Sequence, residues 1–130
     1  MKKIMTFTVV YLCFSSLVYA GSLDTMLGRW AGYYEKANES NKSYDSWMYV
    51  YKSTQNEYIS LWSIVEDSHK SHGFSQFGIE NDVFYSCEWD HTPYRCTYWQ
   101  FLSDTVIRGF RYEADKKGST LICTFYFYKN

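Results

Sequence analysis

The sequence predicts an all-β domain built from eight antiparallel strands that follow one another along the chain. From residue 21 onward, eight segments of strand length alternate with short polar connections. None of these segments carries an apolar stripe at helical period, and no connection is long enough for a crossover helix. An eight-stranded meander closes into a small barrel without leaving free edges. A two-sheet β-sandwich is the alternative arrangement.

The first twenty residues, MKKIMTFTVVYLCFSSLVYA, have the pattern of a secretory signal peptide. Two lysines precede an apolar run, and Val18 and Ala20 supply the small residues expected before a cleavage site. We therefore predict a signal peptide over 1–20, a single domain over 21–130, and a periplasmic or secreted location. Cys13 is not preceded by the small residue that a lipoprotein site requires. No second apolar run of spanning length follows, so no membrane span is expected in the mature chain.

The charge balance of the mature chain is mildly acidic. Removal of residues 1–20 leaves 11 basic and 14 acidic residues. This balance argues against a nucleic-acid-binding surface. About 110 residues form one domain with a modest core, for which a disulfide is a common support in an oxidising compartment.

The predicted elements follow in order from a short helical turn over 23–27. Each strand is rich in aromatic and β-branched residues, and each connection is rich in Asn, Asp, Ser, Lys or Gly. The eight predicted strands are 29–35, 46–53, 57–65, 72–79, 82–90, 94–101, 105–113 and 120–129.

The fifth and sixth strands predict a disulfide-linked hairpin around the loop 90–93, which contains the only proline of the chain. With this loop, antiparallel pairing sets Cys87 opposite Cys96, Tyr85 opposite Tyr98, and Glu88 opposite Arg95 on the other face. Directly opposed cysteines lie within disulfide reach. A nine-residue step is not a zinc-knuckle spacing, and no second cysteine pair follows, so a structural disulfide is favoured over a metal site.

Cys123 is left over in this scheme. It alternates with Leu121, Phe125 and Phe127 on one face of the last strand. We expect a buried, unreactive thiol, because a reactive cysteine requires an electropositive and partly open site. Pairing of Cys123 with Cys87 or Cys96 is the open alternative.

The stretch LGRW, Leu27 to Trp30, resembles the Gly-x-Trp signature of the lipocalins and other calycins. It stands where that family carries the signature, after a short helical turn and at the start of the first strand. The resemblance implies a calycin-like barrel in which Trp30 closes one end. It also implies an arginine from a late strand packed on Trp30, for which Arg108 and Arg111 are the candidates.

The aromatic content suggests a binding function, because 24 of the 110 residues from 21 to 130 are Trp, Tyr or Phe. Tyrosine and tryptophan suit both cavity walls and protein interfaces. Our leading hypothesis is a barrel that binds a small apolar or aromatic ligand. Its candidate ligand-binding residues are Trp30, Trp47, Tyr49 and Trp62.

The alternative hypothesis is an exported inhibitor or immunity protein that binds another protein, such as a cell-wall-degrading toxin. If Glu88 and Arg95 face outward, alternation places Phe84, Trp99 and Phe101 on the same outer face, where they would form a partner surface.

Catalytic and metal-binding patterns are weak. Asp67, His69 and His72 offer possible metal ligands, but an odd-numbered step on a strand points the two imidazoles to opposite faces. The sequence shows no nucleophile elbow and no glycine-rich phosphate loop. We therefore predict a protein without enzymatic activity, cofactor or metal site.

Overall fold

The computed structural model describes residues 22–88, 94–115 and 118–130 of the chain. The predicted signal peptide, Cys13 and the predicted hairpin loop 90–93 lie outside the described residues. Within the described part of the chain, no helix combines the length and the hydrophobicity needed to cross a membrane.

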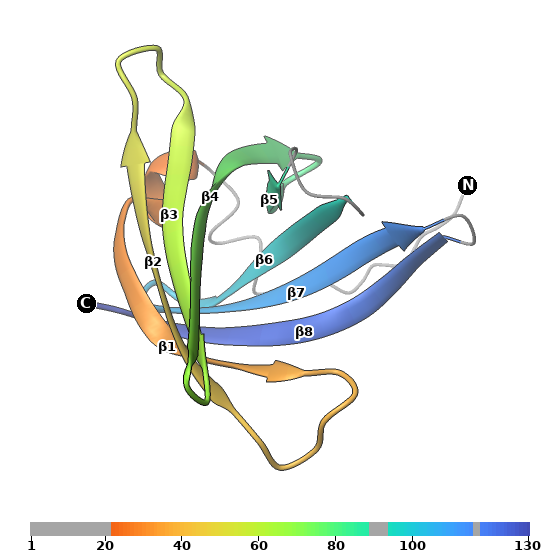
Figure 1. The fold of residues 1–130 in the computed structure, drawn as a ribbon. Helices are drawn as coiled ribbons and strands as arrows, with labels where there is room; N and C mark the ends of the chain where they lie inside the picture. Colours follow the sequence, from red (N-terminus) through yellow and green to blue (C-terminus); the bar gives the residue numbers. More distant parts are fainter. Residues whose placement is uncertain (1–21, 89–93, 116–117) are drawn as a thin grey trace.

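Eight antiparallel strands form a closed barrel in which each strand pairs with its neighbours in sequence and β1 pairs with β8 (Figure 1). This topology confirms the predicted meander and barrel and excludes the sandwich. A short 3-10 helix, η3 (Leu23–Met26), precedes the barrel. The strands are β1 (Gly28–Lys36), β2 (Tyr44–Lys52), β3 (Tyr58–Glu66), β4 (His69–Glu80), β5 (Val83–Glu88), β6 (Arg95–Ser103), β7 (Val106–Asp115) and β8 (Gly118–Lys129).

The strand bounds agree with the sequence-based ranges except at tight turns. β4 begins at His69 rather than near residue 72, because the turn from β3 needs only Asp67 and Ser68. Asp67 adopts a φ of 55°, and Asn81 and Asp82 between β4 and β5 adopt φ angles of 53° and 64°. Asn and Asp tolerate this left-handed conformation, which suits two-residue hairpins. Some of the polar residues that the sequence-based ranges left in loops therefore belong to strands.

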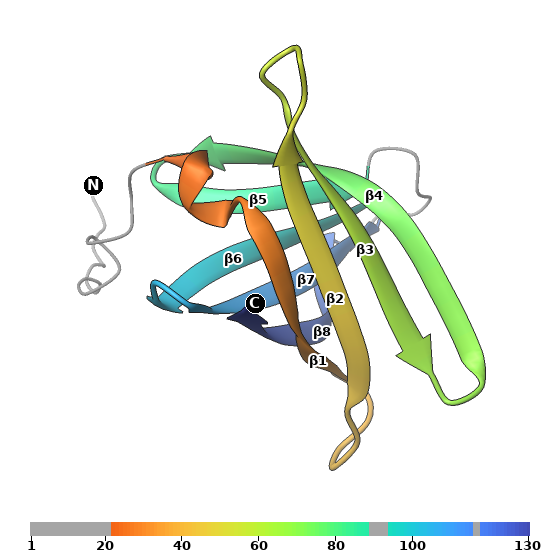
Figure 2. The same ribbon diagram turned by 90° about the vertical axis from the view of Figure 1, so that its left-hand side faces the viewer.

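In Figure 2, η3 lies at one end of the barrel, beside the start of β1. Core residues, many of them aromatic, fill this end. Trp30 is fully buried and meets Phe101 edge to face at 6.2 Å between ring centres. Phe127 stacks on Trp99 at 5.7 Å. The Trp30 indole nitrogen donates a hydrogen bond of 2.9 Å to the carbonyl of Met26, which ties η3 to the barrel. This end of the barrel is closed.

The cation on Trp30 is a lysine, not an arginine. The Nζ atom of Lys129 lies 4.6 Å from the centre of the Trp30 ring. Expecting Arg108 or Arg111 there was wrong, for two reasons. Arg108 follows the inward-facing Ile107 and so points outward, where it donates a hydrogen bond to Gln100. Arg111 faces inward but lies four residues beyond Ile107, about 13 Å farther along the strand.

Two interior tryptophans lie against glycines on the neighbouring strand. Trp62 pairs with Gly73 across β3 and β4, and Trp99 pairs with Gly109 across β6 and β7. A Cβ atom at Gly73 would lie 2.5 Å from Cζ2 of Trp62, and one at Gly109 would lie 2.6 Å from Cζ3 of Trp99. A side chain at either glycine would force the ring or the backbone to shift, so the missing side chains make room for both indoles.

Candidate ligand-binding pocket at the open end of the barrel

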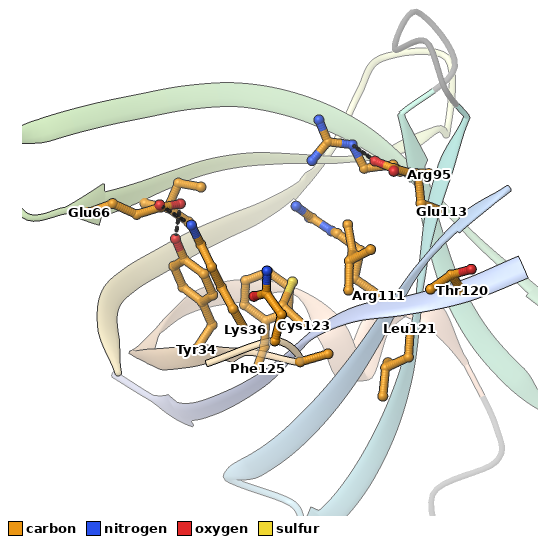
Figure 3. Close-up of a pocket in the computed structure, with 14 residues that line it drawn as sticks. Tyr34, Lys36, Glu66, Arg95, Arg111, Glu113, Thr120, Leu121, Cys123 and Phe125 are labelled. Carbon is orange, nitrogen blue, oxygen red and sulfur yellow. Dashed lines mark hydrogen bonds and ion pairs between the residues drawn. The ribbon is translucent and has the colours of Figure 1, made fainter. Parts of the chain in front are cut away.

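A cavity of about 430 Å³ occupies the end of the barrel opposite η3 (Figure 3). We call it the mouth pocket. It is formed by the last residues of β1, β3 and β7, the first residues of β6 and β8, and the chain that follows β1. These segments meet here because consecutive antiparallel strands alternate in direction, so every second strand end lies at the same rim.

One part of the wall of the mouth pocket is apolar. Its side chains come from three strands and include Tyr34, Ile64, Leu121, Ile122 and Phe125. Tyr34 and Phe125 are almost fully buried, and their ring centres lie 5.4 Å apart. These two rings connect the pocket to the aromatic core below it and offer a flat surface to an apolar group.

The rim of the pocket carries a three-residue cluster of Tyr34, Lys36 and Glu66. Glu66 accepts a hydrogen bond from the Tyr34 hydroxyl and pairs with Nζ of Lys36 at 2.5 Å. Burial opposes ionisation of Glu66, but the hydrogen bonds from Lys36 and Tyr34 outweigh it and hold the pKa of the carboxyl below its ordinary value. Burial and the bond to Glu66 raise the pKa of Tyr34. The cluster joins the end of β1 to the end of β3 across β2.

A second ion pair lies across the pocket from this cluster. The Nε atom of Arg95 on β6 lies 3.5 Å from a carboxylate oxygen of Glu113 on β7, and both side chains are largely shielded from solvent. Both residues line the pocket. Figure 3 shows Arg111 between this pair and the Lys36–Glu66 pair.

Arg111 forms the base of the mouth pocket. It is only 7% exposed. Its Nε atom donates a hydrogen bond of 3.0 Å to the Thr97 hydroxyl, and its Nη2 atom lies 3.4 Å from a carboxylate oxygen of Glu88. The guanidinium carbon lies 4.8 Å from the centre of the Phe125 ring and 5.6 Å from that of Trp62. These contacts fix the plane of the cation inside the barrel.

Below Arg111 lies a second, much smaller space, which we call the inner chamber. Its volume is about 10 Å³. Four serines line it, one from each of β2, β3, β4 and β5: Ser46, Ser60, Ser75 and Ser86. The Ser60 and Ser75 hydroxyls bond to each other at 2.7 Å, and Ser86 accepts a bond of 2.9 Å from the Trp99 indole. The buried indole nitrogen of Trp62, which also lines the chamber, finds no acceptor among the described residues.

The predicted ligand-binding residues are distributed over three places. Trp62 faces the barrel interior and lines the inner chamber. Trp30 lies in the closed end, where it packs against the core. Trp47 and Tyr49 lie on the outer face, Tyr49 being 45% exposed and Trp47 stacking under the exposed Arg29. Assigning these two to an internal wall was wrong, because Met48 and Val50 are the inward residues of β2.

The predicted partner surface is also corrected. Phe84, Trp99 and Phe101 are buried at 3%, 6% and 6% exposure and belong to the core. The strand register is as predicted, with Glu88 opposite Arg95 and Cys87 opposite Cys96. However, the face that carries Glu88 and Arg95 is the interior, where each of these charges pairs with a residue of β7. Phe84, Trp99 and Phe101 lie on the same strand face as these two charged residues and therefore also point into the interior.

The cysteines behave as predicted. Cys87 and Cys96 form a disulfide across directly opposed positions of β5 and β6. Cys123 is free and buried, and burial raises the pKa of its thiol. It also lies in the wall of the mouth pocket.

Several pocket residues were missed in the sequence, although a signal for them exists. Tyr34 and Lys36 stand four and six residues after Trp30, so alternation along β1 places all three on the inner face. The same rule applied from Ile107 points to Arg111 and Glu113. Among the described residues, no group of three or more His, Cys, Asp or Glu side chains is arranged to hold a metal ion.

Comparison with known proteins identifies the fold. No protein-family model and no curated protein sequence matches the chain. Among solved structures, the chain is similar to an odorant-binding protein from bovine nasal mucosa, with a TM-score of 0.52 and 16% sequence identity. The alignment covers 85% of this chain and 74% of that chain. Together with the closed barrel, the leading 3-10 helix and the buried Trp30, this similarity shows that the chain has a lipocalin-like, calycin-type fold.

Proposed function

We propose that the protein binds a small, largely apolar molecule in the mouth pocket. The observation that carries this proposal is the cavity of about 430 Å³ at the open end of the barrel. Small-molecule sites are typically concave spaces of about 300–1,000 Å³ with an apolar wall and a few fixed polar groups. The similar bovine protein is named for odorant binding, which supports the same class of function.

The lining of the mouth pocket suggests an amphipathic ligand. Tyr34, Ile64 and Phe125 offer an apolar surface on one side, while Lys36, Glu66 and Arg111 present charged groups at the rim and the base. A ligand with an aromatic or aliphatic body and one polar group would satisfy both parts of the wall. The proposed class of ligand is therefore narrower than the apolar or aromatic class predicted from the sequence, because it also requires a polar group.

We also propose that the protein is exported. The pattern of residues 1–20 and the Cys87–Cys96 disulfide support this location, because disulfides persist in oxidising compartments. Mass spectrometry of protein from the periplasm or the medium should find a chain that begins at Gly21. An exported chain that retains Met1 would contradict the proposal.

The binding function is tested by filling the pocket. Ile64 faces the pocket, whereas the next residue, Val65, is 36% exposed on the outer face. We expect Ile64→Trp to weaken the binding of 2-acetylnaphthalene by about tenfold or more, since it removes the space for the probe. Val65→Trp is the matched control and should bind like the parent. Tryptophan fluorescence and equilibrium dialysis measure the affinity.

A second pair of variants guards against misfolding of Ile64→Trp. Thr120 is exposed and lines the pocket rim, while the adjacent Ser119 is exposed but does not line it. Thr120→Trp should reduce binding of 2-acetylnaphthalene, and Ser119→Trp should not. Equal affinities for all four variants would exclude the mouth pocket as the binding site.

A further inference from the structure

Among the described residues, each cation that lines the mouth pocket is paired with a carboxylate. Lys36 pairs with Glu66, Arg95 with Glu113, and Arg111 with Glu88. Within the described part of the chain, these three pairs balance the charges of the pocket lining and its base. The deepest pair is the most shielded, with 8% exposure for each of the two side chains. A second anion placed beside Arg111 would therefore lie near the buried carboxylate of Glu88.

Arg111 nevertheless retains capacity to donate hydrogen bonds. A guanidinium has five N–H groups. The Nε–H group is used by Thr97, and Nη2 meets Glu88 at 3.4 Å, which is long for a charge-assisted hydrogen bond. The terminal nitrogens belong to a side chain that lines both the mouth pocket and the inner chamber. Phe125 and Trp62 contact the guanidinium, so Arg111 is held in place before a ligand arrives.

We infer, on the basis of the proposed binding function, that the ligand is electrically neutral and places a hydrogen-bond acceptor oxygen on Arg111. A carbonyl, ether or hydroxyl oxygen would accept from the terminal N–H groups without adding charge. A carboxylate would be repelled by Glu88 and would lose its hydration, while the described cations of the pocket are already paired. A pure hydrocarbon would cover the N–H groups and leave them unpaired. The ligand body then lies along Phe125 and Ile64.

Three naphthalene probes of similar shape separate these classes: 2-acetylnaphthalene, 2-ethylnaphthalene and 2-naphthoate. They differ in carrying a neutral acceptor, no acceptor, and a negative charge. With the parent protein we expect 2-acetylnaphthalene to bind about tenfold more tightly than either of the other two, the ratio that one satisfied buried donor supplies. Competitive dialysis at fixed ionic strength gives the three affinities.

Glu88→Gln provides a sharper test, because it removes the internal counter-charge and keeps the shape. Arg111 then carries an unbalanced positive charge, and we expect 2-naphthoate to overtake 2-acetylnaphthalene. Glu80→Gln, at an exposed position of β4, is the matched control and should keep the parental order. The double variant E88Q/R111M removes both charges. It should bind 2-acetylnaphthalene no more tightly than 2-ethylnaphthalene.

The outcomes distinguish this inference from the binding function itself. If 2-ethylnaphthalene or 2-naphthoate binds the parent as tightly as 2-acetylnaphthalene, the neutral-acceptor inference is wrong and the binding function stands. If Glu88→Gln folds and keeps the parental order of affinities, Arg111 does not recognise the ligand. If none of the three probes binds, both the inference and the proposed function fail.

Discussion

The ammonium group of Lys129 lies 4.6 Å from the centre of the Trp30 ring, and it also donates a hydrogen bond to the carbonyl of Leu27. Lys129 is at the end of the last strand, and Trp30 is near the start of the first. Their contact connects β1 to β8, the strand pair that closes the barrel. Burial lowers the pKa of Lys129, so its two contacts compensate a desolvated cation.

Replacing Lys129 tests how much its contacts with Trp30 and Leu27 stabilise the barrel. We expect Lys129→Met to lower the free energy of unfolding by about 1–2 kcal/mol, because it removes the cation–π contact and leaves the Leu27 carbonyl without this donor. Lys129→Arg should restore most of the loss, since a guanidinium can make both contacts. Urea denaturation measures both variants. Unchanged stability of Lys129→Met would show that the methylene stem alone packs against Trp30.

The disulfide should stabilise the barrel without being essential to its topology. We expect Cys87→Ala/Cys96→Ala to lower the free energy of unfolding by about 2–3 kcal/mol, the range for a short closed loop. In the unreduced parent, one thiol should react only after denaturation, and this reaction should disappear in Cys123→Ser. A Cys123 thiol that reacts rapidly in the folded protein would contradict its burial.

The rim cluster predicts a dependence of stability on pH. The pKa of Glu66 is lower in the folded chain than its ordinary value near 4.5. Glu66 therefore stabilises the fold above that value, and the contribution disappears as the pH falls through the lowered pKa. We expect the urea concentration at the unfolding midpoint to decrease when the pH is lowered below about 4.5. The decrease should be smaller in Glu66→Gln.

Glu57→Gln is the control for this measurement, because Glu57 is exposed in the β2–β3 turn. It should leave the acid-dependent loss of stability intact. If Glu66→Gln loses stability with acid as steeply as the parent, then other carboxylates cause the effect.

The contact between Gly73 and Trp62 predicts coupled effects of mutation. We expect Gly73→Ala to cost about 1–3 kcal/mol, because its Cβ would overlap the indole ring. In a Trp62→Phe background the same substitution should cost much less, since the overlapping benzo ring is gone. A double-mutant cycle by urea denaturation measures the coupling. Additive effects would mean that the strand backbone moves instead of the ring.

The strands and their register were predictable, because alternation and turn residues are local properties. The paired cysteines and the charges beside them are enough to predict the β5–β6 register. Which face points inward was not predictable from that pattern. Cys87 and Glu88 are neighbours, and both are buried. The charges of Glu88 and Arg95 favoured an outward orientation, although the apolar Phe84, Trp99 and Phe101 share their face and are buried.

The pocket was harder to predict than the fold for the same reason. On β2, Trp47 and Tyr49 are large aromatic residues, yet the smaller, non-aromatic Met48 and Val50 fill the interior. A buried cation such as Arg111 is stable only because Glu88 and Thr97 approach it from other strands. Such contacts depend on the pairing of three consecutive strands and leave no trace in a single segment. The lysine on Trp30 was missed because only the pairing of β1 with β8 sets Lys129 opposite Trp30.

The glycine opposite Trp62 has a consequence for how the binding space can be altered. Since Gly73 contributes no side chain, a single indole fills the volume at that level of the β3–β4 wall. Shortening Trp62 alone would extend the space below Arg111 by the volume of most of an indole ring. The depth of the barrel interior therefore depends on the size of one side chain, that of Trp62.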